Sequence, residues 1–398
     1  MRLYTNLVSG VTSTLSNIFQ KNEYADKAVQ QLLKSNSKWG SRDRRFLAES
    51  IYEIVRWYRL YYEILGQKPK TIDDWYGIFG IYWILKGESL PDWKEFSNLD
   101  EKEIQKQFKN IDQLEIKASI PDWLNEMGQK ELKENWEATI MSLNERSSTV
   151  LRVNTLKTSQ LEAQKALEKE NIETSILSES ALVLKERKNI VHTKAFRNGY
   201  FEVQDASSQE VALFSEIKPD MTVVDACAGA GGKTLHLAAL MENKGKLVAT
   251  DIFGWKLREL AKRAKRAGAS IIRIKTIHND QIFKDLYDTA DRVLLDAPCS
   301  GLGVLRRNPD SKWKLSPKAI NDVIQIQKEI LDNYSPITKK GGLLIYVTCS
   351  ILPSENQEQV QAFLKRNSNF ELIEEKTLLP QDFGFDGFYM AKMRRKSE

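Results

Sequence analysis

The sequence predicts a doubly wound α/β domain at the C-terminal end, preceded by a small α+β unit and by an N-terminal all-helical domain. From about residue 205 onward strands and helices alternate, which is typical of a parallel sheet covered on both faces. A glycine-rich turn directly follows one of these strands. Before about residue 140, apolar residues recur at helical spacing. We therefore expect domains at residues 1–143, 144–204 and 205–398.

The N-terminal region is predicted to be helical because residues such as Leu47, Ile51 and Tyr58 fall on one helix face. Its many aromatic residues, Trp75 among them, are expected to fill the core rather than to stack on bases. The longest apolar run, residues 78–85, is too short to span a bilayer. We therefore expect a cytoplasmic protein that does not contact a membrane.

The chain is mildly basic, with 59 Lys and Arg residues against 54 Asp and Glu residues and a formal net charge of +5. This balance is compatible with a polyanionic partner but does not establish one. The basic residues within 41–45, together with Arg56 and Arg59, form either a phosphate-binding face or a solvated helix face. Three cysteines without a Cys-x-x-Cys pair and three scattered histidines predict no metal site and no disulfide framework.

The central unit combines short alternating segments with one helix. Strands are expected at 149–155, 181–185 and 200–204, and a helix at 159–170. Basic side chains, including Lys157 and Arg197, are available in this unit for RNA. Small α+β units of this kind often bind RNA, but the pattern alone does not assign that role.

The glycine-rich turn has the sequence Asp225-Ala226-Cys227-Ala228-Gly229-Ala230-Gly231-Gly232-Lys233-Thr234. It joins an apolar strand to a helix expected to begin near Thr234, so the backbone can approach a ligand and the helix start offers unpaired N–H groups. A P-loop would require glycine where Cys227 stands. The strand at 246–251 ends in Asp251, where a carboxylate can bind ribose hydroxyls. These features predict a Rossmann-like cofactor domain rather than only a tight strand–helix corner.

Further strands and helices complete the predicted sheet. They are strands at 271–274, 292–296 and 343–348, helices at 255–267 and 317–334, and an antiparallel pair within 370–393 at one edge. Gly341 and Gly342 are expected to form the turn that precedes the strand at 343–348.

Two cysteines stand just past the ends of two predicted strands. Cys299 lies in Asp296-Ala297-Pro298-Cys299-Ser300-Gly301, and Cys349 lies in Thr348-Cys349-Ser350. Residues that follow strands in an open α/β sheet line the cleft beside the cofactor. A buried structural cysteine is the usual interpretation of one such residue. Two thiols at cleft positions favour nucleophilic chemistry instead.

These motifs, in this order and spacing, resemble the RNA cytosine carbon-5 methyltransferases of the RsmB/NOP (Sun) family. The resemblance covers roughly residues 120–393. It includes four further stretches at 151–155, 204–209, 306–313 and 353–356. The central unit is similar to the family's RNA-recognition-like insert, and the region before residue 120 is similar, more loosely, to the NusB-like RNA-binding domain of bacterial members. The resemblance implies a class I S-adenosylmethionine-dependent methyltransferase fold.

The resemblance also implies roles for individual residues. Cys349 would attack carbon 6 of a cytidine, and Cys299 would assist breakdown of the covalent intermediate. Asp296 would stand between methyl donor and base, with Lys233 close by. The residues expected to hold S-adenosylmethionine are Cys227, Ala228, Gly229, Ala230, Gly231, Gly232, Lys233, Asp251 at the ribose, Asp280 at the adenine side, and Asp296.

The expected reaction is methylation of carbon 5 of a cytidine in 16S ribosomal RNA, with transfer RNA as the alternative substrate. Arg152 and Asn154 would face RNA or support the cleft, and a monomer is expected. Three other functions stay open. They are a non-catalytic RNA-binding factor for ribosome assembly, a methyltransferase acting on amino groups, and, least favoured, a dinucleotide oxidoreductase.

Overall fold

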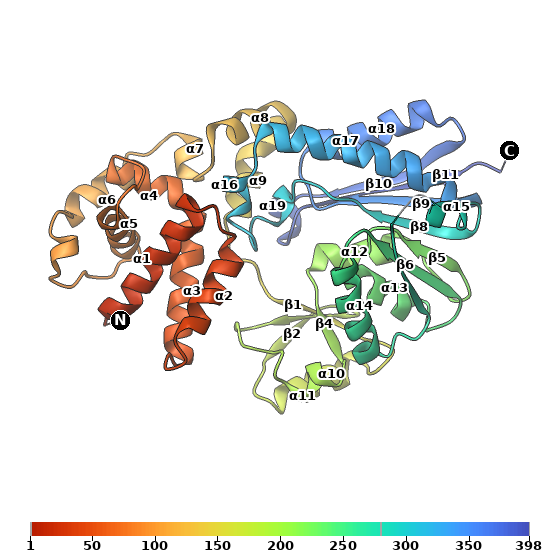
Figure 1. Cartoon of the computed structure of the whole chain (residues 1–398), viewed down its shortest axis with the longest axis horizontal. Coiled ribbons are helices and arrows are strands. Elements are labelled where there is room, and N and C mark those ends of the chain that lie inside the picture. Colours follow the sequence, from red (N-terminus) through yellow and green to blue (C-terminus); the bar gives the residue numbers. More distant parts are fainter. Residues whose placement is uncertain (1, 279–280, 398) are drawn as a thin grey trace. The chain divides into compact units, whose positions relative to one another are not determined.

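The computed structural model describes residues 2–278 and 281–397, which form two compact units (Figure 1). The first unit contains Met1–Glu145 and Leu305–Pro317, and the second contains Arg146–Val304 and Lys318–Glu398. Within the described residues, no helix is both long and apolar enough to cross a membrane. Among the described residues, no group of three or more His, Cys, Asp or Glu side chains could hold a metal ion. The predicted limits of three domains remain a proposal.

The first unit is helical, as the sequence predicts. Its principal helices are α1 (Thr5–Gln20), α2 (Ala25–Ser35), α3 (Ser41–Arg56), α4 (Tyr58–Leu65), α5 (Ile72–Leu85), α6 (Glu101–Lys109), α7 (Leu114–Lys117), α8 (Asp122–Leu132) and α9 (Trp136–Leu143), with short 3-10 turns η1 (Lys94–Phe96) and η2 (Lys133–Asn135). The aromatic side chains fill its core as expected, because Trp75 and Trp83 are each only 1% exposed.

A short segment from late in the chain completes this helical unit. It contains α16 (Ser311–Lys314). The indole N–H of Trp313 donates to the carbonyl of Val55 at 2.7 Å, and Asp310 accepts a hydrogen bond from the N–H of Ala25 at 2.9 Å, at the first residue of α2. The buried ammonium of Lys312 donates to the carbonyl of Arg56 at 2.8 Å. Burial and the nearby Arg56 charge lower the pKa of Lys312 well below its usual value.

The predicted basic helix face is wrong at two of its positions. Arg56 is 4% exposed and donates to the carbonyl of Arg306 at 2.9 Å. Arg59 is 9% exposed and donates to the carbonyl of Ile120 at 2.7 Å. Both guanidinium groups therefore satisfy buried backbone carbonyls within the helical unit instead of facing phosphates.

The second unit contains a small antiparallel sheet. Its strands are β1 (Val150–Val153), β2 (Thr174–Ser178), β3 (Ala181–Leu184) and β4 (Phe201–Val203), in the order β2-β3-β1-β4. Two helices, α10 (Gln160–Glu168) and α11 (Lys194–Arg197), pack apolar side chains such as Leu167 and Ala195 against the sheet. This arrangement matches the α+β unit that the alternation of the sequence predicts.

The second unit also contains a seven-stranded mixed sheet with the order β10-β11-β9-β8-β5-β6-β7. The strands are β5 (Thr222–Asp225), β6 (Lys246–Asp251), β7 (Ile272–Thr276), β8 (Ala290–Asp296), β9 (Thr338–Thr348), β10 (Phe370–Leu378) and β11 (Phe388–Arg395). Strands β5 to β9 are parallel, and β10 and β11 form the predicted antiparallel pair at one edge.

Helices cover both faces of this sheet (Figure 1). One face packs against α12 (Ala206–Phe214), α13 (Gly232–Leu240) and α14 (Gly254–Ala267), and the other against α17 (Pro317–Tyr334) and α18 (Gln357–Arg366). Shorter elements are α15 (Gln281–Lys284), α19 (Pro380–Phe383), η3 (Leu302–Val304), η4 (Ser335–Ile337) and η5 (Pro353–Glu355). The predicted doubly wound architecture is confirmed.

One local prediction about the central sheet needs correction. Gly341 and Gly342 lie inside β9 rather than in a turn before it. The register with β8 shifts between Ala290 and Arg292, and Gly341 has a φ of 75°. The glycine pair therefore forms a bulge that lets the strand begin earlier, since glycine adopts positive φ without steric cost.

Candidate active site

The carboxyl ends of the parallel strands meet at the point where the strand order changes direction. From β5 the chain proceeds outward through β6 and β7, whereas β8 and β9 lie on the other side of β5. Asp251 and Asp296 are the last residues of β6 and β8, and Cys349 follows β9. Ligands of open α/β sheets bind at such a switch point. The fold thus brings the predicted site residues that it describes to one edge of the sheet.

The glycine-rich loop between β5 and α13 has a fixed backbone and an open face. The N–H of Ala228 donates to the carbonyl of Thr250, and the N–H of Gly231 donates to that of Ala228, each at 2.9 Å. A Cβ on Gly231 would lie 2.1 Å from Cδ1 of Leu260, and its φ of 86° also favours glycine. A Cβ on Gly229 would meet nothing within 4 Å, so a ligand can approach the backbone there.

Two carboxylates frame this loop. Asp251 accepts hydrogen bonds from the N–H groups of Gly229 and Phe253, each at 2.8 Å. Asp225 accepts a bond from the hydroxyl of Thr234 at 2.6 Å, but its other oxygen is buried and has no hydrogen-bond partner among the described residues. A buried acceptor without a partner, next to an open glycine loop, fits a cofactor that carries cationic and hydroxyl donors. Asp280, predicted at the adenine side, lies outside the described residues.

Burial raises the pKa of Asp225 to about 7, and the hydrogen bond from Thr234 only partly opposes this. A carboxyl whose pKa is higher in the folded state binds a proton there that the unfolded chain has released. The free energy of unfolding should therefore fall as the pH rises toward about 7. Asn does not ionise, so Asp225→Asn removes this loss. Between pH 5 and pH 8, the free energy of unfolding of Asp225→Asn should therefore rise by about 2–3 kcal/mol relative to that of the wild type.

Urea unfolding of both proteins at pH 5, 6.5 and 8 measures this difference. Asp220→Asn, an exposed change just before the same strand, is the control. A constant difference between wild type and Asp225→Asn across this pH range would contradict the raised pKa.

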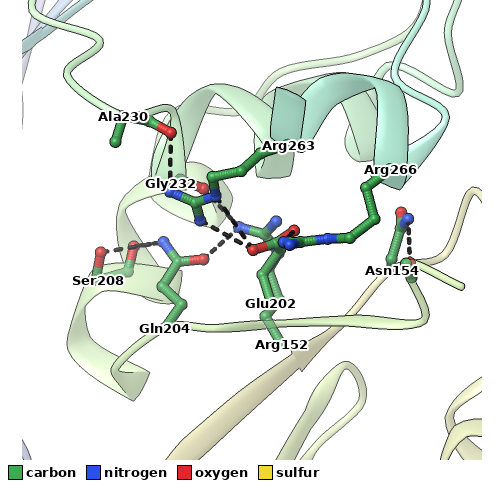
Figure 2. A network of polar contacts seen from close by, with 10 residues as sticks. Arg152, Asn154, Glu202, Gln204, Ser208, Ala230, Gly232, Arg263 and Arg266 are labelled. Carbon is green, nitrogen blue, oxygen red and sulfur yellow. Dashed lines mark hydrogen bonds and ion pairs between the residues drawn. The ribbon is translucent and has the colours of Figure 1, made fainter. Parts of the chain in front are cut away.

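A buried polar network ties the cofactor loop to the small antiparallel sheet (Figure 2). Arg263 of α14 donates to the carbonyl of Ala230 at 2.8 Å and forms an ion pair with Glu202 of β4 at 3.0 Å. Arg152 of β1 donates to the carbonyl of Gly232 at 2.7 Å. Glu202 is 3% exposed and also pairs with Arg266. The network positions two carbonyls of the loop from outside it.

Arg152 contacts the cofactor loop at the carbonyl of Gly232, whereas Asn154 donates to the carbonyls of Gly199 and Ala267 at the far end of α14. Their exposed fractions are only 1% and 4%. Sequence reasoning did not find Glu202 or Arg263. Neither stands in a recognisable motif, and their proximity depends on how the small sheet packs against α14.

The thiols of Cys299 and Cys349 lie side by side. Their sulfur atoms are 3.3 Å apart, and both cysteines are free. The contact with Cys349 and burial raise the pKa of the Cys299 thiol well above its usual value, and the charge of Glu355 adds to this. Cys299 therefore stays protonated beside its neighbour, an arrangement in which its S–H can donate to a Cys349 thiolate.

Lys233 and Asp296 form an ion pair at the same edge, with Nζ 2.7 Å from the carboxylate oxygen. The ammonium also lies 5.2 Å from the ring centre of Phe388. Burial alone would lower the pKa of Lys233, but Asp296 outweighs it and the net pKa is raised, with a further contribution from Cys349.

A buried carboxylate joins the two cysteine segments. Glu355 is 0% exposed, and one of its oxygens accepts hydrogen bonds from the hydroxyls of Ser300 and Ser350, the residues that follow the two cysteines. Its other oxygen accepts from the N–H of Ser300 at 2.8 Å and from the side-chain amide of Gln327 at 3.0 Å. The sequence offered one signal for Glu355, since the stretch 353–356 matched the family pattern, but it indicated no role.

Comparisons with known proteins agree with this arrangement. The family described as 16S rRNA methyltransferase RsmB/F matches residues 212–394, and a ferredoxin-like domain of RsmF/B-type methyltransferases matches residues 120–191. A protein of Synechocystis named probable ribosomal RNA small subunit methyltransferase B is 32% identical, covering 96% of this chain and 97% of that protein. The chain belongs to the RsmB/F family. S-adenosylmethionine is the cofactor of these methyltransferases, as the sequence predicted.

Two further similar proteins cover parts of the chain. The Bacillus subtilis protein named probable ribosomal RNA small subunit methyltransferase B is 38% identical, covering 62% of this chain and 59% of that protein. A solved structure titled as a methyltransferase homologue from Pyrococcus horikoshii is 26% identical with a TM-score of 0.62, covering 71% of this chain and 97% of that one. The class I fold, with its ferredoxin-like unit and helical N-terminal region, is therefore confirmed.

Proposed function

We propose that this RsmB/F-family protein methylates carbon 5 of a cytidine in 16S ribosomal RNA through a covalent bond between Cys349 and carbon 6. The observation that carries the proposal is the pair of thiols 3.3 Å apart at the ends of β8 and β9, beside the cofactor loop. Methylation of an amino group needs no thiol, whereas methylation of carbon 5 of cytosine does. The substrate follows from relatives named ribosomal RNA small subunit methyltransferases.

The chemistry explains the need for a thiol. Carbon 5 of cytosine is a poor nucleophile, and addition of the Cys349 thiolate to carbon 6 makes it electron-rich. S-adenosylmethionine supplies the methyl group as a sulfonium. Transfer leaves carbon 5 with both a methyl group and a proton. A general base takes that proton, the electrons of the broken C–H bond re-form the C5–C6 double bond, and the Cys349 thiolate leaves carbon 6.

The neighbouring residues have complementary roles. Lys233 holds Asp296 through their ion pair, and Asp296 hydrogen-bonds the polar edge of the base. Cys299, kept protonated, supplies a proton to the departing Cys349 sulfur and so assists release. The residues proposed to hold the cofactor are those of the loop from Cys227 to Lys233, with Asp225, Asp251, Asp280 and Asp296.

The test is the identity of the methylated nucleoside. Purified protein is incubated with in-vitro-transcribed 16S ribosomal RNA and methyl-labelled S-adenosylmethionine, and the RNA is then digested to nucleosides. We expect label in 5-methylcytidine, and none with Cys349→Ala. Label in N4-methylcytidine or in a methyladenosine would contradict the proposal.

A parallel reaction with transfer RNA addresses the alternative substrate. Label in transfer RNA alone would replace ribosomal RNA as the substrate while leaving the chemistry intact. Binding of RNA and of S-adenosylmethionine without label in either RNA would favour the non-catalytic assembly factor.

A further inference from the structure

A basic hollow of about 740 Å³ lies in the second unit, where the small antiparallel sheet meets α14. Apart from Asn198 and Tyr200, each residue lining it is Lys or Arg, and none is acidic. The basic residues are Lys157, Arg197, Lys262, Lys265 and Arg266. They come from three segments, namely the loop after β1, the end of α11 and the last turns of α14. The positive charge is therefore gathered by the fold and does not come from a single helix.

The walls of the hollow are fixed to each other. The side-chain amide of Asn154 donates to the carbonyls of Gly199 and Ala267, each at 2.8 Å. Gly199 has a φ of 75°, and a Cβ there would lie 2.2 Å from the carbonyl oxygen of Arg266, so the loop backbone contacts the helix end directly. The stem of Lys157 lies across Gly268 in the same way, because a Cβ on Gly268 would be 2.7 Å from its Cε. The backbone segments that carry the cationic residues are therefore fixed around a preformed hollow.

Most of this positive charge is not neutralised locally. Arg266 pairs with the buried Glu202 (Figure 2), and Lys262 pairs with the exposed Glu259 at 3.5 Å. Lys157, Arg197 and Lys265 have no ion-pair partner among the described residues, and all three are exposed. The C-terminal dipole of α14 offsets only about half a charge. An excess of positive charge therefore faces solvent.

We propose that this hollow binds the phosphodiester backbone of the substrate RNA, at a second contact away from the reacting cytidine. The identity of the RNA rests on the proposed function. α14 begins beside the cofactor edge and ends at Ala267, about 20 Å further along its axis. An open basic hollow at that distance suits a backbone that passes along the surface, and release of counterions from the RNA drives such binding.

The hollow is also connected to the cofactor loop. Arg266 and Arg263 share the carboxylate of Glu202, and Arg263 holds the carbonyl of Ala230 (Figure 2). The exposed cations can be removed without disturbing this buried network, so Lys157, Arg197 and Lys265 are the positions to change. Arg266 is left in place.

The experiment compares a triple variant with a matched triple control. Lys157→Gln, Arg197→Gln and Lys265→Gln are combined in one protein, and Lys165→Gln, Lys169→Gln and Lys365→Gln in the other. The control positions are exposed and do not line the hollow. Binding of a 16S ribosomal RNA fragment is followed by fluorescence anisotropy between 50 and 300 mM salt, and S-adenosylhomocysteine affinity is measured as a check of the fold.

We expect the hollow variant to bind RNA at least about 10-fold more weakly at low salt, with a salt slope reduced by roughly 2. The control should stay within about twofold of the wild type, and both variants should keep their cofactor affinity. An equal loss in both variants, or no loss in either, would overturn the proposal. Because RNA binding is measured without turnover, the comparison decides the matter even if the wild type methylates no cytidine.

Discussion

The Cys299→Ala protein is expected to remain covalently joined to RNA, whereas Cys349→Ala should form no adduct and lose methylation by roughly 10³-fold or more. The sulfur atoms lie 3.3 Å apart, so Cys299 can reach the sulfur that bonds carbon 6. The contact with Cys349 and burial raise the pKa of Cys299, so its thiol holds a proton that is missing from the site in Cys299→Ala. Addition and methyl transfer would then proceed, but departure of Cys349 would stall.

The measurement is a denaturing gel of each variant, expressed with host RNA, before and after ribonuclease treatment. A ribonuclease-sensitive shift should appear for Cys299→Ala alone. The double variant Cys299→Ala/Cys349→Ala is the control and should show none. A shift that appears only in Cys349→Ala would exchange the roles of the two thiols. Absence of a shift in both single variants, with cofactor binding intact, would exclude the covalent mechanism.

The positions of Asp251, Asp296 and Cys349 at the carboxyl edge of the sheet could be predicted because the elements that carry them are local. Each parallel strand is a short apolar run, and an acid or a cysteine stands at its end, so placing the strands also places Asp251, Asp296 and Cys349. The glycine-rich turn could also be predicted from its residues. Gly231 lies against Leu260, and no larger residue fits there.

Contacts between distant segments could not be predicted in this way. Arg56 resembles a surface cation in the sequence, yet it satisfies a carbonyl about 250 residues later, at Arg306. In the sequence, Leu305–Pro317 lies between elements of the α/β domain, but in the structure it completes the helical unit. Helical spacing identifies a buried face only when the residues on it are apolar, and Arg56 and Lys312 are buried through hydrogen bonds instead.

Glu355 is the clearest example, near the two cysteines, of a residue whose contacts come from distant segments. It is neither beside a cysteine in sequence nor expected inside a core, yet four donors from three segments converge on its carboxylate. Such a residue acts through others. It holds the turns after Cys299 and Cys349 together, and a displacement of about 1 Å between reacting groups can cost roughly 10²-fold in rate.

Glu355→Ala is therefore expected to lower kcat by about 10²-fold and the free energy of unfolding by about 3 kcal/mol, because the N–H of Ser300 loses its acceptor and the Gln327 amide keeps only the carbonyl of Pro298. Glu355→Gln should recover much of the rate. Its carbonyl oxygen can face those two fixed N–H donors, while its amide faces the two serine hydroxyls, which can rotate to accept. Glu358→Ala, an exposed change three residues later, is the control.

Steady-state kinetics separates positioning from a merely structural role. The KM for RNA and the affinity for S-adenosylhomocysteine should stay within about twofold in the Glu355 variants, since Glu355 touches neither the cofactor loop nor the basic hollow. The trapped adduct should also form more slowly when Glu355→Ala is combined with Cys299→Ala. A variant that loses stability but keeps its kcat would show that Glu355 only supports the fold. A fall in kcat that Glu355→Gln reverses would show that the hydrogen bonds of this side chain, rather than its charge, position the two cysteine segments.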